Sequence, residues 1–454
     1  MVLSRTTRLP AAATVIATVV ALGACDSSSV APDPAPLAIE SQDRATERPK
    51  NVKCDADNGG LTLPAGFCAV VVARDVGLAR HMAVRPNGDL FVALNNSARL
   101  GITGAVLAVR DTNADARADI MRRFGPTGGN GVFWHEGALF FAPNDRVLRY
   151  RVSGDALVPS DDPVVVVTQL PDTGDHNSKT VVIDRQGSLF LNVGSASNSC
   201  QVRNRVLRSQ GVDPCPELPT RAGVWRFRAS GAEQRQSLAN RFATELRNMV
   251  ALAINPLDGA LYGAQNGRDQ LFENWPNLFT AQDDALLPAE ELFRITQGNA
   301  YGWPYCYYDG AQRRKVLAPE YGGDGNIVGR CASRELPIAD YPAHWAPLSM
   351  LFYTGNQFPQ RYRNGLFIAF HGSRFDPSQQ PAGPGYVVTF TPFDGTRPSR
   401  RFEKFADGFA GGNPTPTGAA HRPVGLAQAP DGSLYISDDK AGWIWRVFFV
   451  GASQ

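Results

Sequence analysis

The chain has 454 residues and a formal net charge of +2, with 43% hydrophobic and 19% charged residues. This near-neutral balance excludes an extended basic surface for nucleic acid, and the hydrophobic content is enough for a sizeable buried core. The 44 Gly and 33 Pro indicate many tight turns. The composition therefore favours a turn-rich globular fold with no nucleic-acid partner.

The first 25 residues predict an export signal that is not part of the fold. Arg5 and Arg8 precede an apolar stretch over residues 11–22, which is short for a membrane span. The stretch ends in Leu-Gly-Ala-Cys, which resembles the cleavage box of bacterial lipoprotein signals, so we expect Cys25 to carry a lipid. Ordinary signal-peptide cleavage with an incidental cysteine is the alternative.

The residues after the signal predict a tether and then one domain. Residues 26–52 are rich in Ser, Pro, Ala and charge, which is typical of a disordered segment. The domain is expected over residues 53–454. The expected location is the periplasmic side of a bacterial membrane, with a lipid anchor, and Asp26 slightly favours the inner membrane.

The six cysteines beyond residue 25 fall into three close sequential pairs. An even number of cysteines in an exported protein predicts disulfides. Because nearest neighbours close the shortest loops, the predicted bonds are Cys54–Cys68, Cys200–Cys215 and Cys306–Cys331. No pair has CxxC spacing, so a zinc site is not expected.

Six segments share one pattern, an apolar strand, a tight turn with Gly and a second apolar strand, which is a β-hairpin signal. They cover residues 82–93, 131–142, 180–191, 250–262, 348–370 and 424–436. A third, half-exposed strand follows each hairpin, at residues 105–110, 146–151, 223–228, 291–296, 385–390 and 443–448. A weaker fourth strand, such as residues 163–168, follows in most units. The regular repeat predicts an all-β, six-bladed β-propeller with four-stranded blades rather than a sandwich.

The last unit lacks a fourth strand, and residues 67–72 form an apolar strand with no other partner. We therefore predict that residues 67–72 join residues 443–448 in the sixth blade and close the ring. The wide spacing after the turn glycines Gly187, Gly259 and Gly365 predicts loops inserted into these blades.

In each hairpin the turn lies at one end of the blade, so the residues before the first strand and after the second strand meet at the other end. Before the first strands come His81, His176, Arg247, Asn248, His344 and Arg422. After the second strands come Asn95, Asn96, Ser195, residues 266–269, residues 371–374 and residues 438–440. Cations arranged in a ring suit an anionic ligand, and a histidine in a cleft suits a general base near neutral pH.

Two kinds of metal site can be weighed at this end. A zinc hydrolase would be possible from the number of histidines, but no two histidines are spaced i, i+4 on a helix. A site for a hard cation is better supported, because Asp269 lies with backbone carbonyls in the Gly-containing loop 265–269, and calcium prefers oxygen ligands.

Several of these segments resemble the soluble glucose/sorbosone dehydrogenase family, most closely its sorbosone branch. The similar segments are residues 246–253, 266–269, 290–304, 346–353, 365–373 and 422–439. The resemblance implies a six-bladed quinoprotein that uses pyrroloquinoline quinone and calcium.

The resemblance also implies roles for individual residues. His176 aligns with the proton-abstracting base, and Arg247 and Asn248 align with a cofactor-binding pair, with Arg247 also stabilising negative charge in the reaction. The calcium loop aligns with the carbonyls of Gly267 and Arg268 and with Asp269. The remaining cofactor-binding positions fall at His371, where the glucose enzymes have Lys, at Arg422 and at Lys440. The family's second cofactor-binding Arg falls at Ala420, and the acidic partner of the base falls near Ser195, so glucose specificity is not expected.

The activity implied is hydride transfer to pyrroloquinoline quinone from a sugar or a sugar-derived alcohol or aldehyde. A redox carrier in the membrane or periplasm would then take the electrons close to the lipid anchor. A calcium-dependent, lactonase-like hydrolase is one alternative, and it would not need the cations Arg247, Arg422 and Lys440. A non-catalytic binding propeller is the other, since fold does not establish function.

Overall fold

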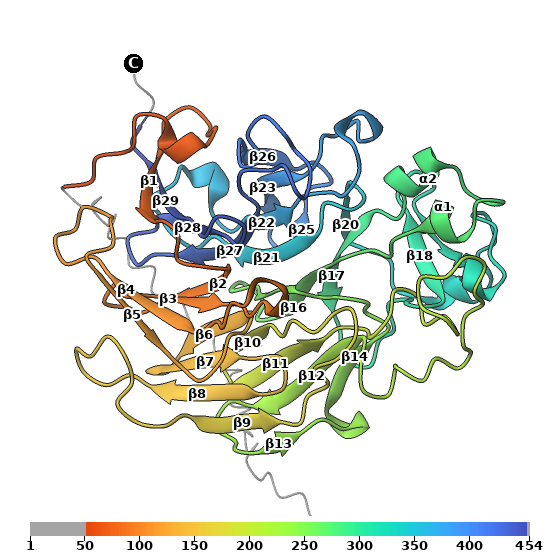
Figure 1. Ribbon diagram of the computed structural model, residues 1–454, viewed down its shortest axis with the longest axis horizontal. Helices are drawn as coiled ribbons and strands as arrows, with labels where there is room; N and C mark the ends of the chain where they lie inside the picture. Colours follow the sequence, from red (N-terminus) through yellow and green to blue (C-terminus); the bar gives the residue numbers. More distant parts are fainter. Residues whose placement is uncertain (1–50, 452–454) are drawn as a thin grey trace, which may run out of the picture. The chain divides into compact units, whose positions relative to one another are not determined.

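The structure is a computed structural model that describes residues 51–451. Six antiparallel sheets stand around one axis (Figure 1), which confirms the six-bladed β-propeller. The predicted signal with Cys25, and nearly all of the predicted tether, lie outside the described residues. Within residues 51–451 no helix combines the length and the apolar character that crossing a membrane requires.

Each blade has an innermost strand beside the axis, and each innermost strand contacts the next around the ring. The innermost strands are β2 (Ala79–Val84), β6 (Gly131–His135), β10 (Val181–Ile183), β15 (Ala251–Ile254), β21 (Pro347–Phe352) and β27 (Pro423–Gln428). The second strands are β3 (Leu90–Leu94), β7 (Ala138–Ala142), β11 (Ser188–Val193), β16 (Leu261–Gln265), β22 (Leu366–His371) and β28 (Leu434–Asp438). These pairs are the six predicted hairpins.

The third and fourth strands complete the blades outward from the axis. The third strands are β4 (Val106–Arg110), β8 (Val147–Arg151), β12 (Gly223–Arg228), β17 (Glu290–Ile295), β23 (Tyr386–Thr391) and β29 (Ile444–Phe449). The outermost strands are β5 (Ile120–Phe124), β9 (Val164–Thr168), β14 (Arg241–Thr244), β20 (Ala339–Tyr341), β26 (Glu403–Ala406) and β1 (Phe67–Ala73). The second blade gains a short fifth strand, β13 (Gln234–Arg235), parallel to β9.

The hairpin turns have the backbone geometry that their residues suggest. Gly88 and Gly432, for example, have φ of 96° and 87°, which side chains rarely tolerate. In the fifth hairpin Asn364 takes the left-handed position with φ of 60°. The next residue, Gly365, is needed for space, because a Cβ there would lie 2.3 Å from the Phe390 ring.

The ring closes as predicted, because the N-terminal strand β1 pairs antiparallel with β29 of the last blade. Phe67 lies opposite Phe449, and its buried ring makes edge contacts with Phe358, Tyr362 and Phe405 of the fifth blade and its loops. Six buried apolar clusters fill the spaces between successive blades, including the space between the sixth blade and the first. The two ends of the repeat are therefore joined by both hydrogen bonds and a core.

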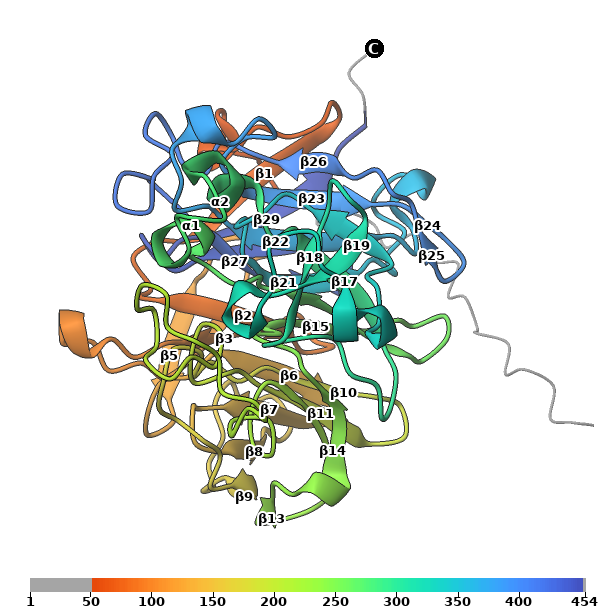
Figure 2. The same ribbon diagram turned by 90° about the vertical axis from the view of Figure 1, so that its right-hand side faces the viewer.

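Insertions in the third and fourth blades form a lobe at one side of the ring (Figures 1 and 2). It contains α1 (Leu271–Asn274), α2 (Ala281–Leu286) and the hairpin of β18 (Cys306–Asp309) and β19 (Arg314–Leu317); the fifth blade carries its own small hairpin of β24 (Phe393–Asp394) and β25 (Arg397–Pro398). All three predicted disulfides are present. Two of them, Cys200–Cys215 and Cys306–Cys331, lie in one buried cluster of the lobe.

Candidate active site

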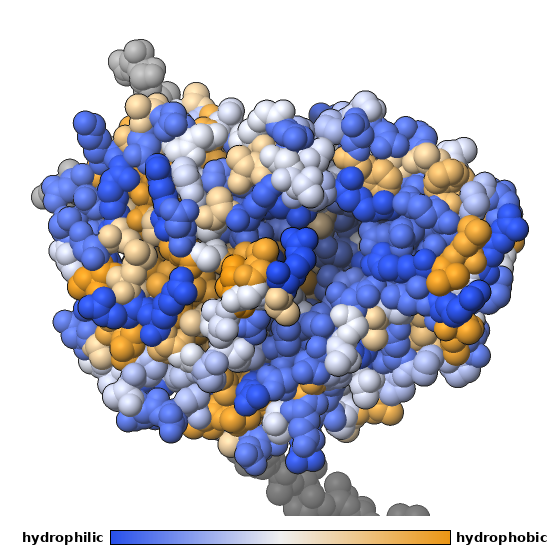
Figure 3. Space-filling model, viewed as in Figure 1, coloured by the Kyte–Doolittle hydropathy of each residue, from blue (hydrophilic) through white to orange (hydrophobic). Residues whose placement is uncertain are grey.

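A pocket of about 220 Å³ opens at the end of the axis away from the hairpin turns, where the sequence predicts the polar residues to gather. Hydrophilic residues surround the hollow near the middle of this face (Figure 3). We call this cavity the site pocket, and it is lined by His176, Arg247, Asn248, Asn266, Gly267, Asp269, Glu290, His344, Ala346, Gly372, Arg374, Pro416 and Arg422.

His176 lies in the wall of the site pocket with a defined tautomer. Its Nδ1 is 2.8 Å from Ser195 Oγ and 3.1 Å from the Ser195 carbonyl oxygen. The Ser195 hydroxyl donates its own hydrogen to the Ser197 carbonyl at 2.7 Å, so the oxygens facing Nδ1 are acceptors and Nδ1 carries the proton. Burial, aided by the positive charge of Arg247, lowers the pKa of His176 to about 3. The ring is neutral at neutral pH, and Nε2 is an acceptor with no hydrogen-bond partner in the part of the chain that the structure describes.

Arg247 is buried, and its guanidinium is fully used by the protein. Nε and one terminal nitrogen donate to Asn198, and the other terminal nitrogen donates to the Gly267 carbonyl at 2.6 Å. Its Nη2 also lies 3.1 Å from Asp269 Oδ2. Arg247 therefore positions the loop around Gly267 and Asp269 and contributes positive charge from behind it, rather than offering free donors to a ligand.

Asn248, next in the chain, differs from Arg247 because it keeps an unused group. Its Oδ1 is buried and has no hydrogen-bond partner in the described residues. A buried unpaired acceptor is costly, and a donor group of a bound ligand would satisfy it.

Asp269 is surrounded by cations. Its Oδ2 faces Arg247 and Arg205, and its Oδ1 lies 3.6 Å from His344 Nδ1 and 4.0 Å from Arg374 Nε. Burial alone would raise the pKa of Asp269, but His344 and Arg247 hold it well below its usual value. These neighbours favour the ionised carboxylate.

His344 lies in the same wall, and the groups around it favour its charged form. Its Nε2 lies 2.7 Å from the Asp284 carbonyl and 3.0 Å from the Leu287 carbonyl, so Nε2 must carry a proton. Its Nδ1 faces the Asp269 carboxylate, which favours a second proton. Burial opposes the charge, but Asp269 prevails and the pKa of His344 is raised.

Glu290, the first residue of β17, is a site residue that the sequence predictions missed. Its carboxylate accepts the backbone N–H groups of Gly267 and Ala346, each at 2.8 Å. No Lys, Arg or His pairs with it in the described part of the chain, and burial raises its pKa to about 7. The sequence could have indicated Glu290, because the third strand of each blade also begins at the polar end.

The remaining predicted residues are placed differently from one another. Arg422 lines the site pocket and donates to the carbonyls of His371 and Gly372 at 3.0 and 3.2 Å. His371 does not line it; its Nε2 pairs with Asp439 at 2.7 Å. Lys440 is exposed, outside the lining, with its Nζ 2.7 Å from the Thr417 carbonyl. Arg268 points away toward the buried Glu320, so only its backbone could face a metal.

The expected position of His81 before the first strand is wrong, because His81 lies inside β2 and is buried. The β2–β3 pairing is irregular between Ala79 and Met82, and this irregularity is not apparent from the hydrophobic pattern. His81 belongs to a cavity at the other end of the axis.

The fold and the site pocket thus define a six-bladed propeller with a charged pocket at one end of its axis. The chain belongs to the TrAA12-like family, whose model matches residues 61–448. It is similar to an uncharacterized protein from Borreliella burgdorferi, with 31% identity over 206 residues, which are 45% of this chain and 47% of that protein. The chain thus matches about half the length of this relative.

Solved structures agree on the fold. The holo form of the pyranose dehydrogenase PQQ domain from Coprinopsis cinerea has a TM-score of 0.67 and 19% identity, covering 86% of this chain and 97% of that chain. The calcium structure of the AA12 family enzyme from Trichoderma reesei has a TM-score of 0.67 and 18% identity, and the match covers 88% of this chain and 99% of that chain. At these identities the likeness concerns the fold alone.

Proposed function

We propose that the protein is an oxidoreductase that oxidises a hydroxyl or hydrated aldehyde group of a small sugar-type compound, with pyrroloquinoline quinone as hydride acceptor. The observation that carries the proposal is the bare Nε2 of neutral His176 in the wall of a pocket rich in cations. The family match and the quinone-binding domain of the Coprinopsis cinerea neighbour support it.

The residues present fit an anionic, planar cofactor. Arg374 and Arg422 line the site pocket with His344, whose pKa is raised, and Asn248 Oδ1 is a buried acceptor without a partner among residues 51–451. Gly372 allows the chain to approach closely beside Tyr386, where a Cβ would lie 2.3 Å from the ring. The cofactor carboxylates would pair with these cations, which are held in place before binding.

The residues also fit calcium. Asp269, Glu290 and Gly267 all line the site pocket and carry oxygen atoms, the kind of ligand that calcium takes. The buried Glu290 carboxylate has backbone partners but no cation, which a metal ion would supply. The calcium structure of the Trichoderma reesei neighbour supports this assignment.

The mechanism then follows from the chain's own residues. Ser195 holds the Nδ1–H of His176, and Nε2 accepts the proton of the substrate hydroxyl. Arg247 fixes the Gly267–Asp269 loop, and Arg422 adds preorganised positive charge at the pocket wall. The bound quinone supplies the hydride acceptor, which no side chain of this pocket can replace.

We also propose export to the periplasm with a lipid anchor and electron transfer to a redox carrier there. The three disulfides support export, because such bonds persist in oxidising compartments. Labelling of Cys25 by a lipid analogue, and its loss in Cys25→Ala, would test the anchor.

Reconstitution tests the proposed activity. The purified protein is titrated with pyrroloquinoline quinone and calcium, and dye reduction is followed with a panel of aldoses and sugar aldehydes. We expect a change in quinone absorbance on binding and a further change with a substrate. Hydrolysis of lactones without dye reduction would support a hydrolase instead, and absence of cofactor binding would reject the proposal.

A further inference from the structure

Lys179 is a fully buried lysine that the proposed mechanism does not use. Its side chain is 0% exposed, and it does not line the site pocket. Among residues 51–451 no carboxylate forms an ion pair with its Nζ, which bonds backbone carbonyls instead. Burying a charge without a charged partner is costly, and burial, aided by the positive charge of Arg221, lowers the pKa of Lys179 to about 7. The position of this ammonium is therefore not explained by an ion pair.

The ammonium binds two carbonyls that lie at opposite ends of one segment. Nζ donates to the Asn177 carbonyl at 2.7 Å and to the Pro171 carbonyl at 2.9 Å. The residues between them belong to no helix or strand and include His176, which lines the site pocket. We call residues 171–177 the base segment. One side chain thus joins the beginning and the end of the segment that carries the proposed base.

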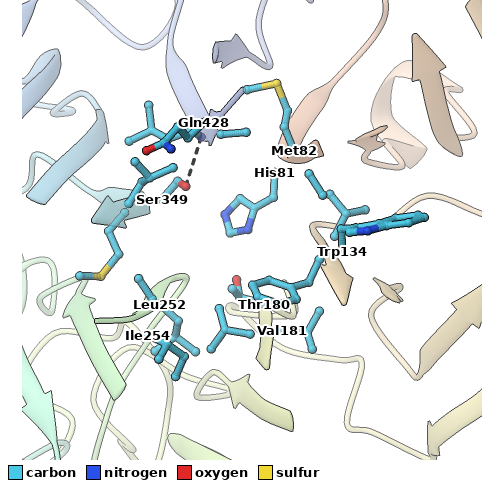
Figure 4. Close-up of a pocket in the computed structure, with 18 of the residues that line it drawn as sticks. His81, Met82, Trp134, Thr180, Val181, Leu252, Ile254, Ser349 and Gln428 are labelled. Atoms are coloured by element: carbon cyan, nitrogen blue, oxygen red, sulfur yellow. Dashed lines mark hydrogen bonds between the residues drawn. The ribbon is translucent and has the colours of Figure 1, made fainter. Parts of the chain in front are cut away.

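The backbone next to Lys179 is anchored at the centre of the propeller. The hydroxyl of Thr180, the following residue, donates to the Val250 carbonyl at 2.7 Å and accepts from Asn130 Nδ2 at 3.1 Å. Val250 and Asn130 come directly before the innermost strands of the two neighbouring blades. Thr180 also lies among the residues around the cavity at the turn end of the axis (Figure 4). Lys179 therefore connects the base segment to the hydrogen-bonded centre of the ring.

The other contacts of the base segment hold mainly its second half. Asp175 donates its N–H to the Ala196 carbonyl at 2.9 Å, and its carboxylate accepts from Arg205 Nε at 2.9 Å. In the first half, the exposed Thr173 accepts from Arg221 Nη2 through its hydroxyl at 3.2 Å. Without the ammonium, the point at which the segment leaves its blade would lose its hydrogen bond to the centre of the ring.

We propose that Lys179 is a positioning residue, which holds His176 at the wall of the site pocket by joining the two ends of the base segment. This inference rests on the proposed function, because it takes His176 as the base. Lys179 acts through the carbonyls of Pro171 and Asn177 and lies outside the lining of the site pocket. A charged donor forms stronger hydrogen bonds than a neutral one, and an apolar side chain here would leave both carbonyls without this donor.

Proteolysis tests the two hydrogen bonds without reference to activity. Endoproteinase Asp-N cuts before aspartate, and the base segment exposes Asp172 and Asp175. We expect mass spectrometry to show cleavage of Lys179→Met at these sites about tenfold faster than in the parent, because a segment that loses two charged hydrogen bonds opens more often. Lys179→Arg keeps the charge and the donors and should be cut at the parent's rate. Lys404→Met, at a lysine whose side chain is 44% exposed, is the matched control and should also be cut as the parent is.

Equal cleavage of the parent and Lys179→Met would overturn the proposal, whether or not the protein is an oxidoreductase. If Lys179→Met does not fold, Lys179→Gln takes its place, since the amide keeps a donor but not the charge. Its cleavage should be intermediate, and cleavage of Lys179→Gln at the parent's rate would then overturn the proposal.

Kinetics of the protein loaded with pyrroloquinoline quinone and calcium separate positioning from a general loss of structure. Lys179→Met should lower kcat about tenfold, with KM and quinone affinity close to the parent's values, because Lys179 lies outside the site pocket. Lys179→Arg should restore most of kcat. An opened base segment with the parent's kcat would overturn the role of Lys179 in positioning His176. If the parent reduces no dye with any sugar, the proposed function fails, and the cleavage pattern alone decides whether Lys179 closes the segment.

Discussion

At the scale of single residues, the proposed base is prepared by a hydroxyl group and a backbone carbonyl. The Ser195 hydroxyl is committed to Ser197 and leaves its oxygen to accept from His176 Nδ1. The Ser195 carbonyl orients the ring and by itself favours its charged form, but burial and the positive charge of Arg247 outweigh it and lower the pKa to about 3. In the same site, neighbouring cations keep the Asp269 carboxylate ionised, whereas Ser195 sets the tautomer of His176.

Ser195→Ala tests this orientation. The Nδ1–H keeps the Ser195 backbone oxygen at 3.1 Å but loses the shorter bond. We expect turnover to fall about fivefold, which corresponds to the loss of one hydrogen bond of about 1 kcal/mol, and cofactor affinity to stay unchanged. Ser197→Ala is the control, because its side chain bonds Glu217 while its carbonyl still accepts from Ser195. Steady-state kinetics that show equal losses in both variants would argue against the role of Ser195.

Glu290→Gln tests the metal site. The amide oxygen can still accept a backbone N–H, so the fold should persist, but a charged ligand is lost. We expect calcium affinity, followed through terbium luminescence, to fall about tenfold. Glu136→Gln, in a hairpin turn with a side chain 81% exposed, should bind terbium as the parent does. Unchanged terbium affinity in Glu290→Gln would remove this residue from the metal site.

Burial of His81 predicts a dependence of stability on pH. The folded pKa is about 4 against about 6.5 in the unfolded chain. Between these values the unfolded state binds more protons, so this contribution is complete above pH 6.5 and is lost as pH falls toward 4. We expect urea unfolding to show about 2 kcal/mol less stability at pH 5 than at pH 7 from this residue. His81→Asn should have a shallower slope, and an identical slope would contradict the assignment.

The sequence predicted which residues gather at the site but not how each is used. His176, Asn248, Asp269 and Arg422 all line the site pocket, because strand order alone brings them to one end. Two of the Arg247 nitrogens donate to Asn198. Asn198 lies in a loop whose course cannot be predicted from the strand repeat.

At the scale of elements, hairpin turns and strand alternation were sufficient to predict the blades. The predicted partner of β29 was correct because only one apolar strand lacked a place. The course of the inserted lobe was not predictable, since its contacts are between loops rather than between repeats. Its two disulfides were predictable because sequence neighbours form them.

Phe67→Ala tests the closure of the ring. The Phe67 ring is buried against Phe358, Tyr362, Phe405 and Phe449. Its removal should cost about 3–5 kcal/mol of the free energy of unfolding, measured by urea denaturation. Phe272→Ala, at a ring 37% exposed, should cost far less. If Phe67→Ala and Phe272→Ala lose the same free energy of unfolding, the packing of Phe67 on β1 does not hold the ring closed.

At the scale of the whole molecule, the propeller gives one axis two separate ends. The end away from the turns collects charged residues from several blades, and the turn end is lined by uncharged innermost strands. The buried layer of Val250, Leu348 and Val424 keeps them apart. The sequence repeat was enough to predict the polar end, whereas the second cavity could be found only from the arrangement of the strands around the axis.

Single-turnover reduction of bound cofactor tests the central claim most directly. The protein loaded with pyrroloquinoline quinone and calcium is mixed with a sugar substrate, and quinone absorbance is followed in the parent and in His176→Ala. The account predicts that the rate falls about 10²–10⁴-fold in the variant, the contribution of a positioned general base, while cofactor affinity changes little. An unchanged rate of reduction in folded, cofactor-loaded His176→Ala would contradict it.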